Sequence, residues 1–483
     1  MSWETVIGLE VHVQLRTRTK MFCACRTTFG DLPNTNVCPV CLGLPGALPV
    51  PNGEAVRLGS RAAMALGCTV HATSVFARKN YFYPDLPKGY QISQFDQPLA
   101  TGGRVAFDSP DRGRIEAGVT RLHLEEDAGK LIHDRFPGKT AVDLNRAGVP
   151  LAEIVSEPDL RSPAEARAYL VTLRQILVYA GVSDCSMEQG SLRVDANISL
   201  RRPGESRLGT KTEVKNMNSF ANVERALEAE RARQGALLEG GARVEQVTLL
   251  FDAATGQVRP LRSKEESHDY RYFPDPDLPP LVLSDAWLAE QRSGLPELPE
   301  ARRLRLESAF GLSSYDARVI TSEVPLAEYF EAVVGVGVEA KTAANWVMGD
   351  VMTSFNQTGE FPVSPARLAA LVALVRDAVV SHQAARRIYG ELGSSQEDPR
   401  AVAERLGLLQ VSDQDALGRW VDEVLAAHPA EVARFRGGEA KLVGFFVGQV
   451  MKKSQGKADP KGVQRVLGDR LTKADPPSSS HPH

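Results

Sequence analysis

The sequence predicts an α+β protein in which an antiparallel sheet comes first and helices follow. In residues 191–201, every second residue from Leu192 to Leu200 is apolar, and polar residues stand between them. Since successive side chains of a strand point to opposite faces, this segment has one dry and one polar face. The same alternation occurs in four more segments: residues 6–15, 119–127, 142–145 and 211–215.

Two helices are expected between these strands. Ser162, Pro163 and Glu165 form a capping box with proline at the first helical position, and this helix should end near residue 180. A second helix should follow Ser219 and end at the glycine pair 240–241. Residues 293–299, rich in proline, predict a linker. Beyond it the pattern is helical: 301–310, 314–322, 326–334, 340–355 and 364–380.

These patterns divide the chain into four parts. Residues 1–293 would form a catalytic domain that contains a cysteine knuckle at residues 23–41. A helical domain over residues 294–405 and a small helical tail domain over residues 406–473 would follow. The final residues, 474–483, are rich in proline, serine and histidine, which predicts a disordered tail.

The composition excludes several classes of protein. Of 483 residues, 43% are hydrophobic and 24% are charged, as in ordinary soluble globular proteins. No apolar run approaches the roughly 20 residues that span a bilayer, so no membrane partner is expected. The first residues lack a basic signal region and an arginine-rich transit region, so we expect a cytoplasmic location.

Charge is unevenly distributed along the chain. The net charge of −3 predicts no general attraction to nucleic acid. Between Arg436 and Lys473, however, lysine and arginine recur and the only acids are Glu439, Asp459 and Asp469. This composition suits a polyanionic partner, although many basic surfaces bind nothing.

Four of the six cysteines lie close together. Cys23 and Cys25 are separated by twelve residues from Cys38 and Cys41, a C-x-C and C-x-x-C arrangement typical of tetrahedral Zn²⁺. Four thiolates leave no open position, so the zinc would be structural. The alternatives are a disulfide pair, which a reducing compartment disfavours, or four thiols without a metal.

The polar faces of the predicted strands carry short acids, amides, histidine and arginine rather than the usual mixture of a solvated sheet. Two loops beside them, residues 78–91 and 269–274, combine basic and aromatic residues. Carboxylates hold Mg²⁺, which bridges phosphate oxygens, and aromatic rings stack on bases. No phosphate-binding P-loop and no Ser/His/Asp set is present. The pattern therefore indicates metal-assisted phosphoryl transfer. The carboxylate-rich set comprises Glu10, His12, Glu125, Glu126, Asp127, Asp143, Glu153 and Asp195.

Several long segments are distinctive when taken together. They are Val6–Leu15, Arg78–Gln94, Leu124–Lys130, Asp143–Glu153, Asp269–Pro274, Val447–Lys452 and Gly456–Pro460. In these segments the chain closely resembles the B subunits of the tRNA-dependent amidotransferases that act on aspartyl- and glutamyl-tRNA. The short linker leaves no room for the inserted domain expected of the archaeal E-subunit relatives.

The resemblance implies a fold and a reaction. The fold would be a glutamine-synthetase-like cradle, a helical domain and a tail domain that contacts tRNA. The chain would use ATP and Mg²⁺ to phosphorylate the side-chain carboxylate of Asp or Glu misacylated onto tRNA(Asn) or tRNA(Gln). The amidase of such a heterotrimer, its A subunit, would supply ammonia from glutamine through a tunnel. The small C subunit would clamp the other two together.

The resemblance also implies roles for individual residues. Magnesium would be held by Glu10, His12 and Glu125, and Glu126 belongs to the same catalytic motif. The nucleotide and substrate would be met by the remaining candidates: Lys79 and Lys88 at phosphates, Asn145, Arg146 and Glu153 around the site, Asp195 and Asn197 beside the metal, and, less specifically, Lys215 and Asn216. In one departure, Ala152 stands where a larger aliphatic residue is expected, which alters packing rather than chemistry.

Two alternatives remain open at this point. The chain could be a tRNA-binding scaffold without catalytic groups, or a self-sufficient ligase that uses free ammonium. The absence of a glutaminase constellation fits both the ligase and a partner-dependent enzyme.

Overall fold

The structure, a computed structural model, describes residues 3–261, 269–410, 413–454 and 456–472. The chain divides into two compact units, residues 1–302 and 303–483. The α+β class is confirmed: unit 1 contains a large sheet with its own core, and the helical unit 2 contains two separate apolar clusters. Within the described residues, no helix is long and apolar enough to cross a membrane. The predicted disordered tail lies outside the described residues.

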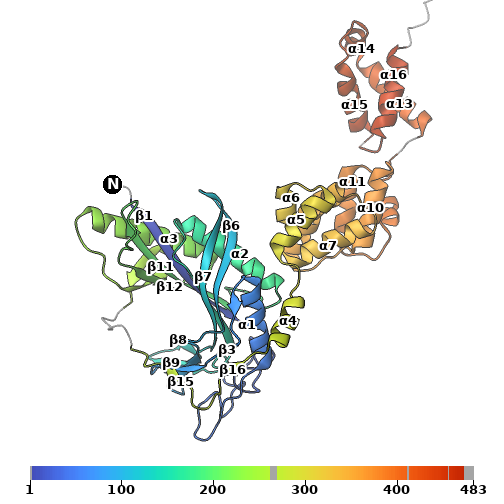
Figure 1. Cartoon of the computed structure of the whole chain (residues 1–483). Helices are drawn as coiled ribbons and strands as arrows, with labels where there is room; N and C mark the ends of the chain where they lie inside the picture. The colour runs from blue at the N-terminus through green and yellow to red at the C-terminus, as the bar shows by residue number, and fades with distance from the viewer. Residues whose placement is uncertain (1–2, 262–268, 411–412, 455, 473–483) are drawn as a thin grey trace, which may run out of the picture. The chain divides into compact units, whose positions relative to one another are not determined.

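The sheet of unit 1 has nine strands in the order β14-β13-β12-β11-β1-β10-β7-β6-β2 (Figure 1). All neighbours are antiparallel except β12 and β13, which run parallel. The three long alternating segments of the sequence are confirmed as β1, β7 and β11. The strand bounds are β1 Glu4–Gln14, β2 Thr69–Val70, β6 Ala100–Ser109, β7 Gly113–Glu126, β10 Pro150–Ser156, β11 Leu192–Arg201, β12 Thr212–Lys215, β13 Thr248–Asp252 and β14 Gln257–Pro260.

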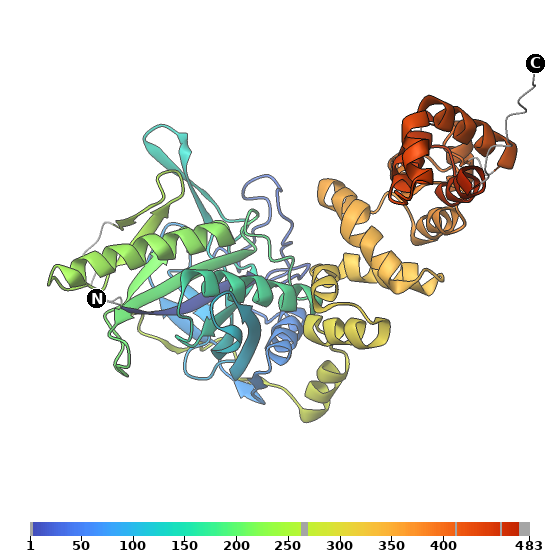
Figure 2. The same cartoon turned by 90° about the horizontal axis from the view of Figure 1, so that it is seen from above.

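Helices α1 (Gly53–Ala65), α2 (Pro163–Tyr179) and α3 (Phe220–Glu239) contribute buried residues to the core on the apolar face of this sheet. The two predicted helices are confirmed: the side chains of Ser162 and Ser219 cap α2 and α3. Helices α2 and α3 pack side by side, and Figure 2 shows them in teal and green. The sequence pattern did not predict α1. The opposite, polar face of the sheet is left free of these helices.

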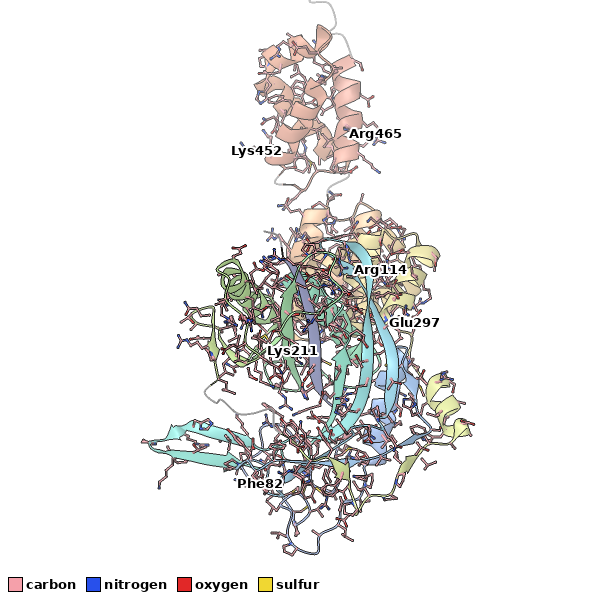
Figure 3. The ribbon with its side chains drawn as sticks, turned by 60° about the vertical axis from the view of Figure 1, so that its left-hand side comes forward. Phe82, Arg114, Lys211, Glu297, Lys452 and Arg465 are labelled. Atoms are coloured by element: carbon pink, nitrogen blue, oxygen red, sulfur yellow. The ribbon has the colours of Figure 1, made fainter. Side chains whose placement is uncertain are left out.

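Smaller sheets surround the end of the main sheet. Strands β4 (Ala77–Asn80), β5 (Tyr90–Ser93) and β15 (Phe273–Pro274) form one sheet, and β3 (Thr73–Ser74) pairs with β16 (Leu281–Val282). The hairpin of β8 (Lys130–Phe136) and β9 (Lys139–Asp143) projects from the body of unit 1 (Figure 3). Phe82, in the loop between β4 and β5, is 91% exposed.

Beyond α4 (Asp285–Ser293), the secondary structure of the described residues is helical, as the sequence predicts. The segment expected as one helix over residues 340–355 instead contains a π-helical turn, η1. The helix expected over 364–380 ends at Arg376, because Ala378 adopts a left-handed conformation with φ 54°. The helix bounds are α5 Pro299–Phe310, α6 Ser314–Ile320, α7 Val324–Gly335, α8 Ala340–Trp346, η1 Val347–Val351, α9 Met352–Thr358, α10 Pro365–Arg376, α11 His382–Leu392, α12 Pro399–Arg405, α13 Gln414–Ala427, α14 Pro429–Arg436, α15 Leu442–Lys453 and α16 Pro460–Thr472.

Candidate active site on the polar face of the sheet

Two carboxylates and two imidazoles meet on the polar face at the centre of the sheet. Glu153 on β10 pairs in register with His12 on β1 and with His123 on β7, so the three side chains share one face. The Glu153 carboxylate lies 3.4 Å from Nε2 of His12 and 3.2 Å from Nε2 of His123. Glu125, two residues beyond His123, lies 3.7 Å from each imidazole. We call these four residues the central cluster.

The charges of the central cluster determine one another. Burial alone would lower the pKa of His123, but hydrogen bonds with Glu125 and Glu153 raise it to about 9. The pKa of His12 is also raised, because Glu153 and Glu125 outweigh its burial. Burial alone would raise the pKa of Glu153, but the two histidines hold it below its ordinary value. The two histidines and Glu153 therefore favour one another's charged forms, as in an ion-pair network.

The central cluster suits a metal ion. One ligand atom each from His12, Glu125 and Glu153 lies within 4.8 Å of the others. Two carboxylate oxygens meet the preference of Mg²⁺ for hard ligands, and waters usually complete its coordination. The expected ligands His12 and Glu125 are brought together, but Glu153 rather than Glu10 is their third neighbour.

Glu10 instead belongs to an adjoining polar row. Its Oε1 accepts a hydrogen bond of 3.0 Å from Asn197, and it pairs in register with Asp195 on β11. Burial, followed by the charges of Glu153 and Glu213, raises the pKa of Glu10. Beside it, Lys215 bonds Asp195 at 2.7 Å. The structure thus brings the predicted Glu10, Asp195, Asn197 and Lys215 together next to the central cluster. Asn216, in contrast, donates to the carbonyl oxygen of Phe251.

The small sheet β15-β4-β5 supplies polar groups to Glu125. The hydroxyl of Ser93 on β5 donates to Glu125 at 3.2 Å. Lys79 on β4 lies 4.8 Å from the ring centre of Tyr270. Burial alone would lower the pKa of Lys79, but Glu125 and nearby phenols and carboxylates raise it. Lys79 is therefore a charged group beside the central cluster, as expected of a phosphate-binding residue.

Glu126 and Lys88 lie elsewhere. Because side chains alternate along β7, Glu126 points away from Glu125 and forms an ion pair with Lys88. Glu126 also accepts a hydrogen bond of 3.0 Å from the backbone of Ile92. Both residues line a cavity of about 120 Å³ behind the cysteine loops. The structure does not bring them into the central cluster.

Asn145 and Arg146 stabilise the loops that border the site. Asn145 accepts from the backbone of Asn36 at 2.8 Å and so ties its own turn to the cysteine segment. Arg146 donates to the carbonyl oxygens of residues 128 and 129 at 2.9 and 2.6 Å. It also lies 3.6 Å from Asp127, which bonds Arg193 of β11 at 2.6 Å. These contacts indicate a positioning role.

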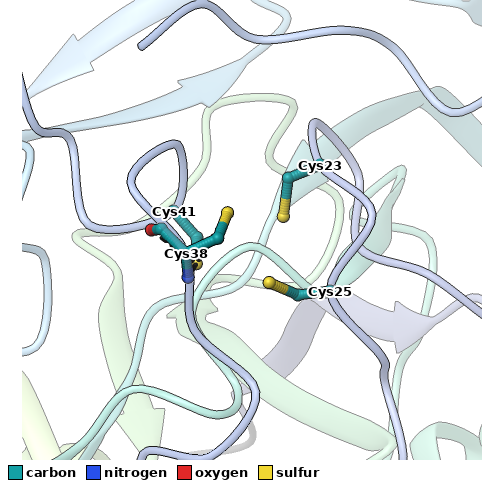
Figure 4. A group of neighbouring side chains, drawn as sticks. All are labelled: Cys23, Cys25, Cys38 and Cys41. Atoms are coloured by element: carbon teal, nitrogen blue, oxygen red, sulfur yellow. Dashed lines mark hydrogen bonds between the residues drawn. The ribbon is translucent and has the colours of Figure 1, made fainter.

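The four cysteines converge from two loops (Figure 4). Their Sγ atoms all lie within 4.8 Å of one another, and those of Cys38 and Cys41 are 3.9 Å apart. A tetrahedral Zn²⁺ with Zn–S bonds of about 2.3 Å requires such spacings. The fully buried Lys20 places Nζ 3.7 Å from Sγ of Cys41, where an ammonium would offset the charge of a thiolate. A hydrogen bond from Cys23 lowers the pKa of Cys41 to about 4. The thiols therefore fit zinc.

The basic C-terminal segment is partly neutralised by acids that precede it in the sequence. Lys453 bonds Glu423 at 2.6 Å, and Arg470 bonds Asp422 at 2.9 Å; both acids are on α13. Lys452 on α15 and Arg465 on α16 project on different sides of the bundle in Figure 3. The positive charge therefore covers more than one face of residues 413–472.

Sequence reasoning left His123 and Ser93 out of the site. His123 stands two residues before Glu125 in the alternating segment, so its spacing already placed it on the same face. Nothing local points to Ser93, because its contact with Glu125 depends on how the small sheet meets the large one.

Comparison with known proteins agrees with this architecture. The family model described as the GatB/GatE catalytic domain matches residues 5–289, and that described as the GatB domain matches residues 328–471. The B subunits of aspartyl/glutamyl-tRNA(Asn/Gln) amidotransferase from Moorella thermoacetica and Geobacter sulfurreducens are 54% and 53% identical to this chain. Each match covers 98% of this chain and 100% of the relative. The chain therefore belongs to the GatB/GatE family, and its catalytic domain lies in unit 1.

Proposed function

We propose that the chain activates the side-chain carboxylate of Asp or Glu carried by tRNA(Asn) or tRNA(Gln), using ATP, and that ammonia then forms the amide. The observation that carries the proposal is the central cluster, with charged Lys79 beside it, on the polar face of a family catalytic domain. The names of the relatives supply the substrate class: misacylated aspartyl- or glutamyl-tRNA.

The reaction needs activation because a carboxylate has no leaving group that ammonia can displace. Transfer of the terminal phosphoryl group of ATP to the carboxylate oxygen gives an acyl phosphate and ADP. Ammonia attacks the acyl carbon, the bond between that carbon and the phosphate oxygen breaks, and phosphate leaves while the nitrogen gives up one proton to form the amide. Negative charge accumulates on the phosphoryl oxygens during transfer, so the enzyme must place positive charge there.

This chain's residues divide that task. Lys79 would neutralise phosphoryl oxygens directly. His12, Glu125 and Glu153 would hold Mg²⁺, which would supply Lewis-acid stabilisation of the negative charge that develops during phosphoryl transfer. Ser93 fixes the orientation of the Glu125 carboxylate, and His123 fixes that of Glu153. The zinc that fits the four cysteines would hold the two loops together and take no part in the chemistry.

The proposal includes partners. Relatives that are named as one subunit of an amidotransferase imply further subunits. We infer an amidase partner that releases ammonia from glutamine and a small partner that joins the two. The helical residues 413–472, with their basic side chains, would contact tRNA. A cytoplasmic location follows from participation in protein synthesis.

The test uses this chain co-purified with its amidase and small partners. Transamidation of Asp-tRNA(Asn) is measured with ATP, Mg²⁺ and ammonium chloride in place of glutamine. Glu125→Gln should abolish Asn-tRNA formation and ADP release and leave glutamine hydrolysis unchanged. Glu116→Gln is the matched control, because Glu116 is on the same strand with a side chain 56% exposed. It should behave as wild type.

The outcomes separate the alternatives. Equal product from wild type and Glu125→Gln would mean that the chain only carries tRNA. Loss of glutamine hydrolysis together with amidation would indicate a disrupted complex rather than a lost activation step. Product from glutamine in the absence of the amidase would contradict the partner-dependent scheme.

A further inference from the structure

Arg121 lies on the polar face of β7, beside the central cluster. It is two residues from His123, so its Cα lies about 7 Å from that of His123 along the strand. It pairs in register with Val155 of β10, which in turn pairs with Glu10 of β1. The β7–β10 register shifts immediately beyond Val155. Such bulges redirect side chains and are common next to active sites.

The side chain of Arg121 has no partner among the residues that the structure describes: none of its guanidinium nitrogens forms a hydrogen bond or ion pair there. Its Nε is buried and unsatisfied. Three other arginines share that feature, but each uses its terminal nitrogens: Arg61 to a carbonyl oxygen, Arg193 to Asp127 and Arg367 to two carbonyl oxygens. A buried donor without an acceptor destabilises the folded chain unless a ligand supplies the acceptor.

Three other cations near the central cluster differ from Arg121. Lys215 is paired with Asp195 and Glu213, and Arg193 is paired with Asp127. Among the described residues, Lys79 contacts the ring of Tyr270 and interacts at longer range with Glu125, and it was already expected at a phosphate. Lys79 approaches the Glu125 end of the central cluster, whereas Arg121 lies beyond His123. Lys79, on β4, and Arg121, on β7, therefore lie toward opposite ends of the His123–Glu125 stretch of β7.

We propose that Arg121 binds a phosphate group of the nucleotide. This inference rests on the proposed function, because it assigns a residue to its ATP site. A guanidinium presents two parallel donors that match two oxygens of one phosphate, and it remains charged at any working pH. Two cations on either side of a carboxylate cluster fit a triphosphate, whose charge extends over several atoms.

The test is direct nucleotide binding by the assembled complex. Equilibrium dialysis with radiolabelled ATP and Mg²⁺, without tRNA, gives Kd for wild type, Arg121→Met and Arg121→Gln. Loss of a charge-assisted pair predicts that Kd for ATP rises at least about tenfold in both variants. KM for Asp-tRNA(Asn), measured with ammonium chloride, should stay within about twofold. Arg104→Met on β6 is the control, since the Arg104 side chain is 77% exposed.

Each result decides the assignment. An unchanged Kd for ATP in both variants would overturn the assignment of Arg121 to the nucleotide. If the KM for tRNA rose while the Kd for ATP stayed unchanged, Arg121 would instead be assigned to a phosphate of the tRNA. If Arg121→Met does not assemble, Arg121→Gln decides in the same way, and thermal unfolding confirms its fold. A wild-type complex that bound no ATP would refute the proposed function itself, whatever the variants did.

Discussion

Replacing Glu153 by glutamine is expected to lower the pKa of His123 from about 9 to about 8 or below. Two carboxylates, Glu125 and Glu153, raise that pKa from 6.5 against the effect of burial. At about 1.4 kcal/mol per pKa unit, the net shift corresponds to roughly 3 kcal/mol, and the favourable interaction with the two carboxylates is larger because it also offsets burial. Glutamine removes one of two comparable partners, so about half of that interaction, which is at least about one pKa unit, should be lost.

The direction of the pH effect follows from the raised pKa. His123 stabilises the folded state fully below its unfolded pKa of about 6.5, and this contribution disappears as pH rises through about 9. In magnesium-free buffer, the contribution of His123 to the unfolding free energy of the wild type should therefore fall by roughly 3 kcal/mol across this window. In the Glu153→Gln variant, this contribution to the unfolding free energy should fall by about half as much across the same window.

The assay is a titration of the Cε1 resonance of His123 in the full-length chain labelled with ¹³C-histidine. His123→Gln identifies the resonance, and Glu116→Gln on the same strand serves as the control that leaves it unchanged. A wild-type midpoint near 6.5 would refute the ion-pair description of the central cluster. An unchanged midpoint near 9 in Glu153→Gln would show that Glu153 does not charge His123.

Two further predictions concern parts outside the sheet. Chelation of zinc, or Cys41→Ser, should increase hydrogen exchange in residues 20–52, because Lys20 and the two loops lose their anionic centre; unchanged protection would contradict a bound structural metal. Deletion of the residues after 408 should raise KM for tRNA about tenfold or more and leave Kd for ATP within about twofold; unchanged tRNA kinetics would count against a role for this segment.

Local sequence was sufficient for much of the fold. Alternation predicted β1, β7 and β11, and the serine caps predicted α2 and α3, because these signals act within a few residues. Helix α1 was not predicted because small residues such as Gly59 and Ser60 weaken its helical pattern. A side chain at position 59 would be too close to the core, since its Cβ would lie 2.6 Å from Leu124. The parallel pairing of β12 and β13 depends on contacts distant in sequence, which no local pattern encodes.

The site was predicted less completely, for the same reason. His12 and Glu125 were expected together and do meet, but register across three strands selects Glu153 as their neighbour. Glu10 is only two residues from His12 and on the same face, yet it lies opposite Asp195 of β11 and accepts a hydrogen bond from Asn197 instead of joining the central cluster. Composition identified the kinds of residue on the polar face, whereas cross-strand pairing determines which of them act together.

Three consecutive acids show how strand geometry separates residues that sequence groups together. Glu125 faces the central cluster, and Glu126, one residue on, faces the cavity and Lys88. Asp127 lies just past the end of β7. Its carboxylate accepts hydrogen bonds from Arg193 of β11 and from Gln14 of β1. A charge change at each position therefore has a different consequence: loss of chemistry at Glu125, loss of the carboxylate partner of Lys88 at Glu126, and weaker contacts among β7, β1 and β11 at Asp127. Substituting the three acids one at a time, rather than as a motif, is what would distinguish catalysis from support.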